Sequence, residues 1–458
     1  MKGKIKVVIV GGSAAGPSAA AAARRRAPEA EIIMLEKGEY ISYGACSLPY
    51  YIGDMIHDYQ VLIARTPEEF REKHGIDVRL GHEALVLDPE KRRLTVRVVR
   101  TGKDYELSYD RLILATGARS KRLGIPGEEA QNIFTLKDMT DGIRIRRFID
   151  EQKPARAVIV GAGYISLEVA EALRERGIET TLLYRGKYPY SGLEPELGPI
   201  IVEEIERHGV RYVGEVHPLA FQDQAGEAQA ILTDKGEFPA DLFFLGVGVT
   251  PNVEMAKEAG VALGESGGIR VNSFLATNLP DIWAAGDCCE KRHQVTGRSV
   301  LIPLGDTANK EGRAAGENAV GGRTEFHGVL GTACVKIFDL EIGLTGITQA
   351  QAEALGLRAV SQVVEASSRV AAYPGAQKTL LKIVADASSG RLLGANWIGR
   401  DGEARKINTL AVALHQRMTV DDISRLDLAY APPFSPVWDP LLIAANLMKR
   451  KIGGRSSA

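Results

Sequence analysis

Two similar stretches of the sequence place the strongest limit on its fold. Each has a short apolar run, a glycine-containing turn and a segment with helical character: KVVIVGGSAAGPSAAAAARRR at residues 6–26 and RAVIVGAGYISLEVAEALRERG at residues 156–177. Glycine lets the backbone turn tightly and approach a pyrophosphate, which the free N–H groups at the helix start can bind. The repeated pattern predicts an α/β chain with two Rossmann-like domains, each binding one dinucleotide.

The first copy is followed by an acid at the expected spacing. The apolar run EIIMLE at residues 31–36 ends in Glu36, twenty residues after Gly16, where a carboxylate can accept hydrogen bonds from ribose hydroxyls. A glycine-rich turn alone would fit any doubly wound protein, but strand, turn, helix, strand and acid in this order favour a dinucleotide site. The candidate binding residues of this copy are Gly11, Gly12, Ser13, Ala15, Gly16, Glu36 and Lys37.

The second copy differs in charge at the end of its second strand. When LYRGKY at residues 183–188 is laid over LEKGEY at residues 35–40, Tyr184 replaces Glu36, Arg185 replaces Lys37 and Lys187 replaces Glu39, so the second site has lost its acid and gained positive charge. An acid favours a free 2′-hydroxyl, whereas arginine or lysine favours a 2′-phosphate, so this site favours NADPH over NADH. The alternative is that both cations are solvated loop residues.

Composition limits the other classes of function. A chain of 458 residues exceeds one ordinary core, so we expect two or three domains. The net charge of -1 suggests neither a nucleic-acid nor a membrane partner, and no apolar run reaches the length of a membrane span. Four cysteines do not make a disulfide framework, which favours a reducing, cytoplasmic location.

Two further apolar runs end in polar or glycine residues. YDRLILATGARS at residues 109–120 carries Thr116 and Gly117 at its end, and LPDIWAAGDCCE at residues 279–290 carries Asp287 after a glycine. An aspartate at the end of a parallel strand is placed to bind a ligand hydroxyl near a helix start. Each match is weak in isolation and gains meaning from its order among the other motifs.

The motif order along almost the whole chain resembles the two-dinucleotide-fold flavoprotein disulfide reductases. The resemblance implies an FAD domain at residues 1–118 and 245–325, an NAD(P) domain at 119–244 and an α+β dimerisation domain at 326–458 of a homodimer. It implies that Asp287 holds the ribityl chain of FAD, and that Tyr164 covers the flavin until the nicotinamide enters. The residues carried over for NADPH or NADH are Gly161, Gly163, Tyr164, Ile165, Glu168, Arg185, Lys187 and Gly248.

The segment SYGACSLPYYIGD at residues 42–54 decides the branch of this family. Cys46 has no cysteine partner five residues away on either side, so it resembles the single-cysteine branch, and most of all coenzyme A-disulfide reductase. The segments AAYPGAQ at 371–377 and LAYAPPFSP at 428–436 extend the likeness, and imply that Tyr373 and Tyr430 reach the partner subunit's active site. Substrate contacts carried over are Arg25, Ser42 and Asn309, whereas Ala45 and His74 depart from the pattern.

Cys46 is the predicted redox centre. Pro49 indicates that a helix starts close by, and a helix N-terminus favours the nucleophilic thiolate. Without a resolving cysteine, the oxidised form is a mixed disulfide or a sulfenic acid. The hypothesis is that NADPH passes a hydride to FAD and that Cys46 then reduces a small disulfide, persulfide or polysulfide. Tyr430 or Tyr373 would protonate the leaving thiolate, unless these tyrosines only pack at the dimer interface.

Several alternatives remain open at this point. Cys46 could be a buried filler thiol, which is a common role of cysteine. An NADH oxidase or peroxidase would cycle through a Cys46 sulfenate, but Ala14 stands where such relatives carry a histidine. A redox sensor or electron-transfer module for a protein partner is a third reading. No metal site is predicted, because the adjacent Cys288 and Cys289 lack further ligands at metal spacing and are interpreted as packing residues, and Cys334 as core.

Overall fold

The first glycine turn follows the carboxyl end of β1, the central strand of a five-stranded parallel sheet with the order β18-β7-β1-β2-β3. The computed structural model describes residues 4–190 and 192–453, so the predicted domain ranges extend beyond it at both ends. The central strands are apolar runs buried on both faces, as helices and strands covering a parallel sheet require. The sheet consists of β1 (Lys6–Val10), β2 (Glu31–Glu36), β3 (Ile76–Leu80), β7 (Arg111–Leu114) and β18 (Ile282–Ala284).

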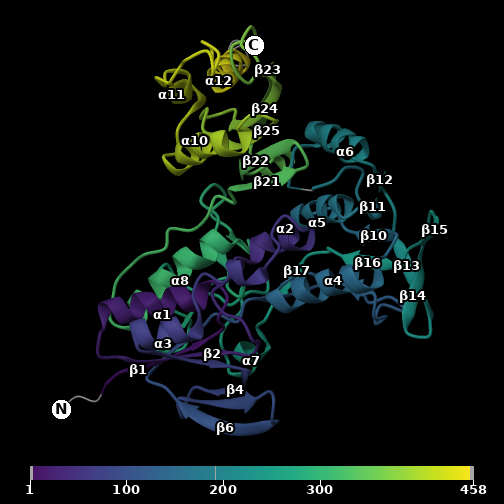
Figure 1. Ribbon diagram of the computed structural model, residues 1–458. Coiled ribbons are helices and arrows are strands. Elements are labelled where there is room, and N and C mark those ends of the chain that lie inside the picture. Colours follow the sequence, from purple (N-terminus) through teal and green to yellow (C-terminus); the bar gives the residue numbers. More distant parts are fainter. Residues whose placement is uncertain (1–3, 191, 454–458) are drawn as a thin grey trace.

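Helices α1 (Ala15–Arg26) and α8 (Gly305–Ala319) pack side by side on one face of this sheet, with α3 (Pro67–His74) beside them (Figure 1). Their contact depends on glycine, because a Cβ built at Gly312 would lie 2.8 Å from the Cα of Ala15, and one at Gly316 2.7 Å from the Cα of Ala19. The other face is covered by an antiparallel sheet of β4 (His82–Asp88), β5 (Arg93–Val98) and β6 (Lys103–Ser108).

The second glycine turn belongs to a second five-stranded parallel sheet with the order β12-β11-β10-β16-β9. Its strands are β9 (Ile133–Phe134), β10 (Arg156–Val160), β11 (Glu179–Leu183), β12 (Val210–Val213) and β16 (Leu242–Leu245). One face is covered by α4 (Met139–Gln152), α5 (Tyr164–Glu175) and α6 (Gly198–Arg207). The other is covered by an antiparallel sheet of β13 (Pro218–Gln224), β14 (Glu227–Thr233) and β15 (Gly236–Pro239).

The chain passes from the first sheet to the second and back through two segments that pair with each other. These are β8 (Ala118–Ser120) and β17 (Val249–Pro251), which are antiparallel. After β17 the chain continues through α7 (Glu254–Glu258) and returns to the first sheet as β18. The exact domain boundaries stay a prediction.

A third sheet, antiparallel and ordered β21-β22-β25-β24-β23, forms the C-terminal unit at the top of Figure 1. Its strands are β21 (Ala333–Ile337), β22 (Leu340–Gly346), β23 (Ala359–Ser367), β24 (Lys378–Asp386) and β25 (Leu392–Gly399). Its helices are α9 (Gln349–Ala354), α10 (Glu403–His415), α11 (Val420–Ser424) and α12 (Pro440–Gly453). The predicted fold class, two Rossmann-like domains followed by an α+β dimerisation domain, is confirmed.

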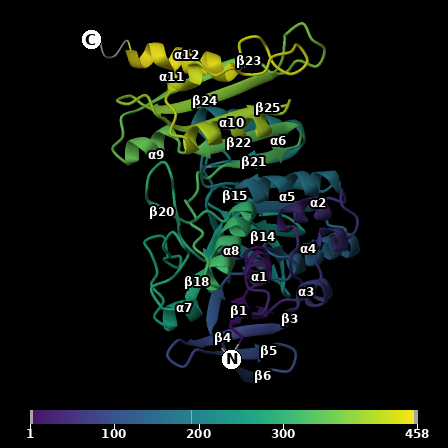
Figure 2. The same cartoon turned by 90° about the vertical axis from the view of Figure 1, so that its left-hand side faces the viewer.

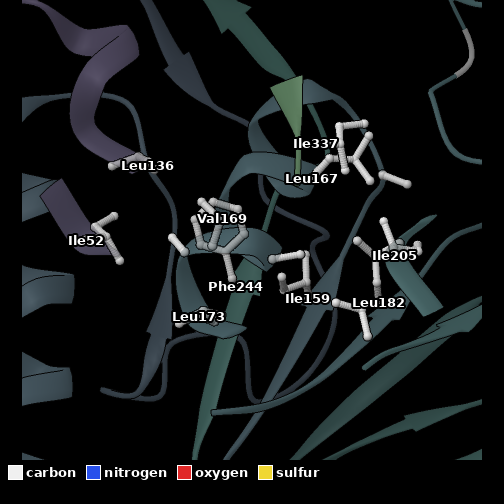
Figure 3. Close-up of a cluster of buried hydrophobic side chains, with 14 of the residues drawn as sticks. Ile52, Leu136, Ile159, Leu167, Val169, Leu173, Leu182, Ile205, Phe244 and Ile337 are labelled. Atoms are coloured by element: carbon white, nitrogen blue, oxygen red, sulfur yellow. The ribbon is translucent and has the colours of Figure 1, made fainter. Parts of the chain in front are cut away.

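One apolar cluster joins the three units and the segment that follows Cys46 (Figure 3). Ile52 comes from α2 (Leu48–Ile52), Leu167 from α5 and Ile337 from β21, and all three are fully buried. The short helix after Cys46 is therefore anchored in a shared core. The remaining short elements are η1 (Ala45–Ser47), η2 (Tyr59–Leu62), η3 (Pro195–Leu197), β19 (Lys291–Arg292) and β20 (Ser299–Val300).

Candidate active site

The first glycine turn has the geometry of a dinucleotide cradle. Gly11 has a φ of 112°, and a Cβ built on it would lie 2.8 Å from the carbonyl carbon of Ala115. A Cβ at Gly16 would lie 2.9 Å from the carbonyl carbon of Gly11, so no larger residue fits at either position. Both close approaches place the backbone of the turn at the start of α1, where free N–H groups can meet a pyrophosphate. These residues fit an FAD.

Glu36 lies directly beside this turn. One carboxylate oxygen accepts a hydrogen bond of 2.7 Å from the N–H of Gly12, and the other accepts one of 2.7 Å from the N–H of Gly38. These bonds hold the carboxylate at the end of β2, where the sequence predicted a ribose acceptor. Lys37 and Ser13 are exposed, and Ala15 is buried against α8.

A lysine that the sequence analysis missed faces Asp287. Lys137, between β9 and α4, donates a hydrogen bond of 2.9 Å to the Asp287 carboxylate. The turn that carries Asp287 is also fixed to α8, because the buried Glu311 of α8 accepts a 2.8 Å hydrogen bond from the N–H of Gly286. Nothing in the local sequence marks Lys137, since it comes from the second sheet's unit and meets Asp287 only in the folded chain.

Thr116 and Gly117 directly precede β8, which pairs with β17 where the chain passes between the two parallel sheets. The Thr116 hydroxyl donates a 2.7 Å hydrogen bond to the carbonyl of Asn252, and the Asn252 side chain donates one of 2.9 Å to the carbonyl of Thr116. Gly117 has a φ of 65°. These contacts brace the first sheet against the return segment, and Asn252 is a further residue that the sequence analysis did not single out.

The second glycine turn repeats the geometry of the first. Gly161 has a φ of 104°, and a Cβ on it would lie 2.7 Å from the carbonyl carbon of Gly246. By contrast, a Cβ at Gly163 would meet nothing within 4 Å, so this glycine borders open space at the start of α5. Gly248 also has a positive φ, of 102°. The turn therefore fits a second dinucleotide, with Arg185 and Lys187 exposed beyond β11.

Tyr164, Ile165 and Glu168 lie on α5, between this turn and Cys46. The Tyr164 hydroxyl donates a long, 3.5 Å hydrogen bond to the carbonyl of Pro303, just before α8. Its ring lies 6.3 Å from that of Tyr190. Burial and, to a smaller extent, the charge of Glu171 together raise the pKa of Glu168 to about 7. Glu168 therefore titrates near neutral pH.

Cys46 lies in η1, two residues before the start of α2, and its side chain is exposed. Its sulfur faces the start of α8, because a Cβ built on Gly305 would lie 4.0 Å from the Cys46 Sγ. Protein atoms displace much of the water around the sulfur, and this desolvation raises the pKa of the Cys46 thiol. The charge of Glu168 adds to the increase, and that of Lys137 opposes it. The sequence analysis expected the helix start to favour the thiolate; in the folded chain, desolvation and the charge of Glu168 act in the opposite direction.

The other cysteines separate into two kinds. Cys288 and Cys289 are fully buried free thiols, and the Cys288 sulfur donates to the carbonyls of Leu114 and Ala285 at 3.4 Å, in agreement with a packing role. Cys334 is exposed on β21, so its interpretation as a core residue is wrong. The alternation along β21 buries Val335 and turns Cys334 to the other face of this edge strand.

The candidate substrate residues follow the seam between α1 and α8. Asn309, one turn after Gly305, accepts a 2.6 Å hydrogen bond from Ser18 of α1, a residue that the sequence analysis missed. Arg25 lies seven residues further along α1 and is exposed. Ser42 lies beside the first turn, where its N–H donates a 2.8 Å hydrogen bond to the carbonyl of Gly12. The seam thus starts beside Cys46 and ends at Arg25, whose charge acts on Glu317 but which makes no ion pair within the described part of the chain.

Tyr373 and Tyr430 lie in two adjacent loops of the C-terminal unit, joined by a hydrogen bond from the N–H of Val370 to the carbonyl of Pro432. Both rings are exposed, and among the described residues neither hydroxyl has a hydrogen-bond partner. Phe434 and Trp438 nearby are 76% and 62% exposed. Large apolar side chains exposed together on one surface are typical of an interaction site. No helix among the described residues is long and apolar enough to cross a membrane.

Comparisons with known proteins agree with this geometry. The family model described as pyridine nucleotide-disulphide oxidoreductase matches residues 5–312, and its dimerisation-domain model matches residues 332–440. An NAD(P)H coenzyme A polysulfide/persulfide reductase of Pyrococcus horikoshii is 37% identical over 97% of this chain and 99% of the relative. A coenzyme A disulfide reductase of Staphylococcus epidermidis is 32% identical over 94% of this chain and 96% of the relative.

The solved structures lead to the same family. The NAD-dependent persulfide reductase of A. fulgidus matches with a TM-score of 0.95 at 35% identity, covering 98% of this chain and 84% of that one. The similarity extends through both glycine turns, the Cys46 segment and the C-terminal sheet, because the match spans nearly the whole chain.

Proposed function

The chain belongs to the pyridine nucleotide-disulphide oxidoreductase family, and on that premise we propose that it uses NAD(P)H to reduce a low-molecular-weight disulfide or persulfide of coenzyme A. It is an FAD-dependent enzyme, as its family and its two dinucleotide turns require. The observation that carries the proposed substrate class is Cys46, an accessible thiol between the two turns with no disulfide partner.

Bound FAD supplies the two-electron chemistry that links hydride donation by NAD(P)H to disulfide reduction. The chain's own part begins when the Cys46 thiolate attacks one sulfur of R–S–S–R, forming Cys46–S–S–R and expelling R–S⁻, which takes up a proton. Addition of two electrons to this mixed disulfide restores the Cys46 thiolate and releases the second R–S⁻. Each turnover therefore consumes two electrons and two protons and releases two thiols.

The shape and charge of the seam between α1 and α8 support a substrate that is a long, thin thiol with an anionic end. It runs from Gly305, beside Cys46, past the Asn309–Ser18 pair to Arg25. At 1.5 Å per helical residue, the step from Ser18 to Arg25 alone covers about 10 Å. Arg25 makes no ion pair among the described residues, so its guanidinium is available to a phosphate. Coenzyme A joins a thiol to phosphates through such a linear arm.

The enzyme acts as a homodimer in this proposal, with Tyr430 and Tyr373 of the partner subunit completing the site. Their exposure, their unpaired hydroxyls and the apolar residues around them support a role at a subunit contact. A phenol has a pKa near 10, so it can donate a proton to a leaving thiolate while remaining neutral. We also place the enzyme in the cytoplasm, where reducing conditions keep free thiols such as Cys46 active.

NADPH is the proposed electron donor. Tyr184 stands where the first copy carries Glu36, and the exposed Arg185 and Lys187 follow it; neither cation makes an ion pair among the described residues. Lys187 only approaches the Tyr188 ring, 5.2 Å from its centroid. Two free cations at the end of β11 favour a 2′-phosphate over a 2′-hydroxyl.

The decisive experiment compares Cys46→Ser with Cys334→Ser, a matched loss of the other exposed thiol. Cys46→Ser should retain FAD and lose thiol release from coenzyme A disulfide, whereas Cys334→Ser should keep near-normal activity. Full activity in Cys46→Ser would refute the scheme, and loss in both variants would refute the single-cysteine mechanism.

Intact mass spectrometry of the purified protein tests the thiol itself. A Cys46 adduct of coenzyme A mass supports the substrate, and a persulfide mass supports its polysulfide form. A sulfenate adduct together with oxygen or peroxide consumption in place of thiol release would favour the oxidase alternative. Slow turnover with every small disulfide and tight binding to a redox protein would instead favour an electron-transfer module.

A further inference from the structure

A basic cavity of about 240 Å³ lies at the junction between the β19–β20 hairpin and the C-terminal unit. In Figure 2, β20 of this hairpin lies below the C-terminal unit. Three arginines and two histidines from separate parts of the chain line the cavity, together with one glutamine: Arg292, Gln294, His327, Arg391, His415 and Arg417. No carboxylate is among its lining residues.

Within the described part of the chain, the three arginines of this cavity have no anionic partners, although Arg292 and Arg417 share this with other exposed arginines of the chain. Among residues 4–190 and 192–453, no carboxylate lies within ion-pair distance of Arg292, Arg391 or Arg417, whereas Arg207 and Arg400 both pair with Glu204. The Nε of Arg391 is buried and has no hydrogen-bond partner. A buried donor without a partner is rare in folded proteins, so a ligand or an ordered water is expected to accept its hydrogen bond.

The electrostatics of Arg391 agree with this geometry. Burial lowers the pKa of Arg391, the charge of Arg417 lowers it further, and Asp386 opposes both effects. His415 is held in place by a 3.0 Å hydrogen bond between its Nδ1 and the Oε1 of Gln294. The arginines of the cavity therefore repel one another, and this repulsion is offset in part by Asp386 near Arg391 and by Glu325, 3.8 Å from the Nδ1 of His327.

The end of α10 explains only part of this charge. Cations near a helix C-terminus stabilise the helix dipole, and His415 and Arg417 lie at that end of α10. Arg292 comes from β19, and Arg391 from the turn before β25, so neither serves that helix. Their convergence on the same cavity needs a different reason.

We propose that this cavity binds a phosphate group, and that the bound anion ties the β19–β20 hairpin to the C-terminal unit. The guanidinium fork matches the oxygens of phosphate in geometry and charge. A cavity of about 240 Å³ is smaller than ordinary ligand pockets of roughly 300–1,000 Å³, which favours inorganic phosphate or pyrophosphate over a whole dinucleotide. The site is built from residues outside both glycine turns and the Cys46 region.

Calorimetric titration of the FAD-loaded protein with pyrophosphate tests the proposal, with NADP⁺ present in excess to occupy the nicotinamide site. Arg292→Gln is compared with Arg298→Gln, an exposed arginine of the same hairpin that does not line the cavity. We expect saturable binding to the unsubstituted protein, weakened about tenfold or more by Arg292→Gln and within about twofold of normal in Arg298→Gln.

The same titration with inorganic phosphate distinguishes the two sources of the group. Tighter binding of pyrophosphate favours a phosphorylated metabolite, and equal affinity favours free phosphate. Absence of saturable binding to the unsubstituted protein would overturn the proposal. Equal weakening in both hairpin variants would also overturn it, because diffuse surface charge would then explain the binding. Neither outcome bears on reduction at Cys46.

Discussion

Replacement of Gly312 by alanine tests whether the close contact of α1 and α8 builds the active site. The new Cβ would lie 2.8 Å from the Cα of Ala15, where ordinary carbon contacts are about 3.5–4.0 Å. Because both sides of the contact are backbone, no rotamer change relieves it, and the helices must separate by about 1 Å. Overpacking of this kind costs about 1–3 kcal/mol, and the better helix propensity of alanine returns about 1 kcal/mol.

The consequences should extend beyond stability, because α1 begins at the first glycine turn and α8 begins at Gly305 beside Cys46. We expect Gly312→Ala to lower the free energy of unfolding by about 1 kcal/mol, the net of these two effects, and to lose FAD during purification. Activity of the FAD-reconstituted protein should fall about a hundredfold, as expected for a displacement of roughly 1 Å between reacting groups.

The measurements are the flavin-to-protein absorbance ratio, denaturant unfolding and the rate of thiol release. Arg313→Ala is the matched control, since this neighbouring exposed residue of α8 makes only a 3.2 Å surface ion pair with Glu317. It should change stability by less than about 0.5 kcal/mol. Full FAD content and normal activity in Gly312→Ala would refute the reasoning.

Three further predictions concern charge. Lys137→Met removes the cation that lowers the pKa of Cys46, so the rise of kcat/KM with pH should move to higher pH; an unchanged pH profile would contradict this role. Arg185→Ala combined with Lys187→Ala should lower the NADPH/NADH ratio of kcat/KM about tenfold, and a ratio below one in the unsubstituted enzyme would contradict the preference. Glu168 has a folded-state pKa of about 7, above its ordinary 4.5, so its contribution to stability is present at low pH and is lost as pH rises from about 4.5 to 7. Glu168→Gln should therefore stabilise the protein relative to the unsubstituted chain by up to about 3 kcal/mol more at pH 8 than at pH 5, measured by denaturant unfolding; a pH-independent difference would contradict it.

Local patterns predicted much of the fold. Both glycine turns, the strand ending at Glu36 and the helix start at Pro49 appear where the sequence placed them, because each depends on neighbouring residues alone. Cys334 was misread, since alternation along a strand shows which residues share a face but not which face is covered. The electrostatic surroundings of Cys46 were misread too, because Glu168 and Lys137 approach it from other units.

The sequence by itself determined the chemistry available to this protein: two dinucleotide turns, and a cysteine, Cys46, without a partner at dithiol spacing. Glycine at Gly11 and Gly161 is a local backbone requirement, and short-range rules suffice to recognise it. Only the tertiary structure decided that Lys137 meets Asp287, that α8 begins beside Cys46, and that three unpaired arginines share one cavity. Desolvation and charge act through space, so these properties depend on which distant segments pack together.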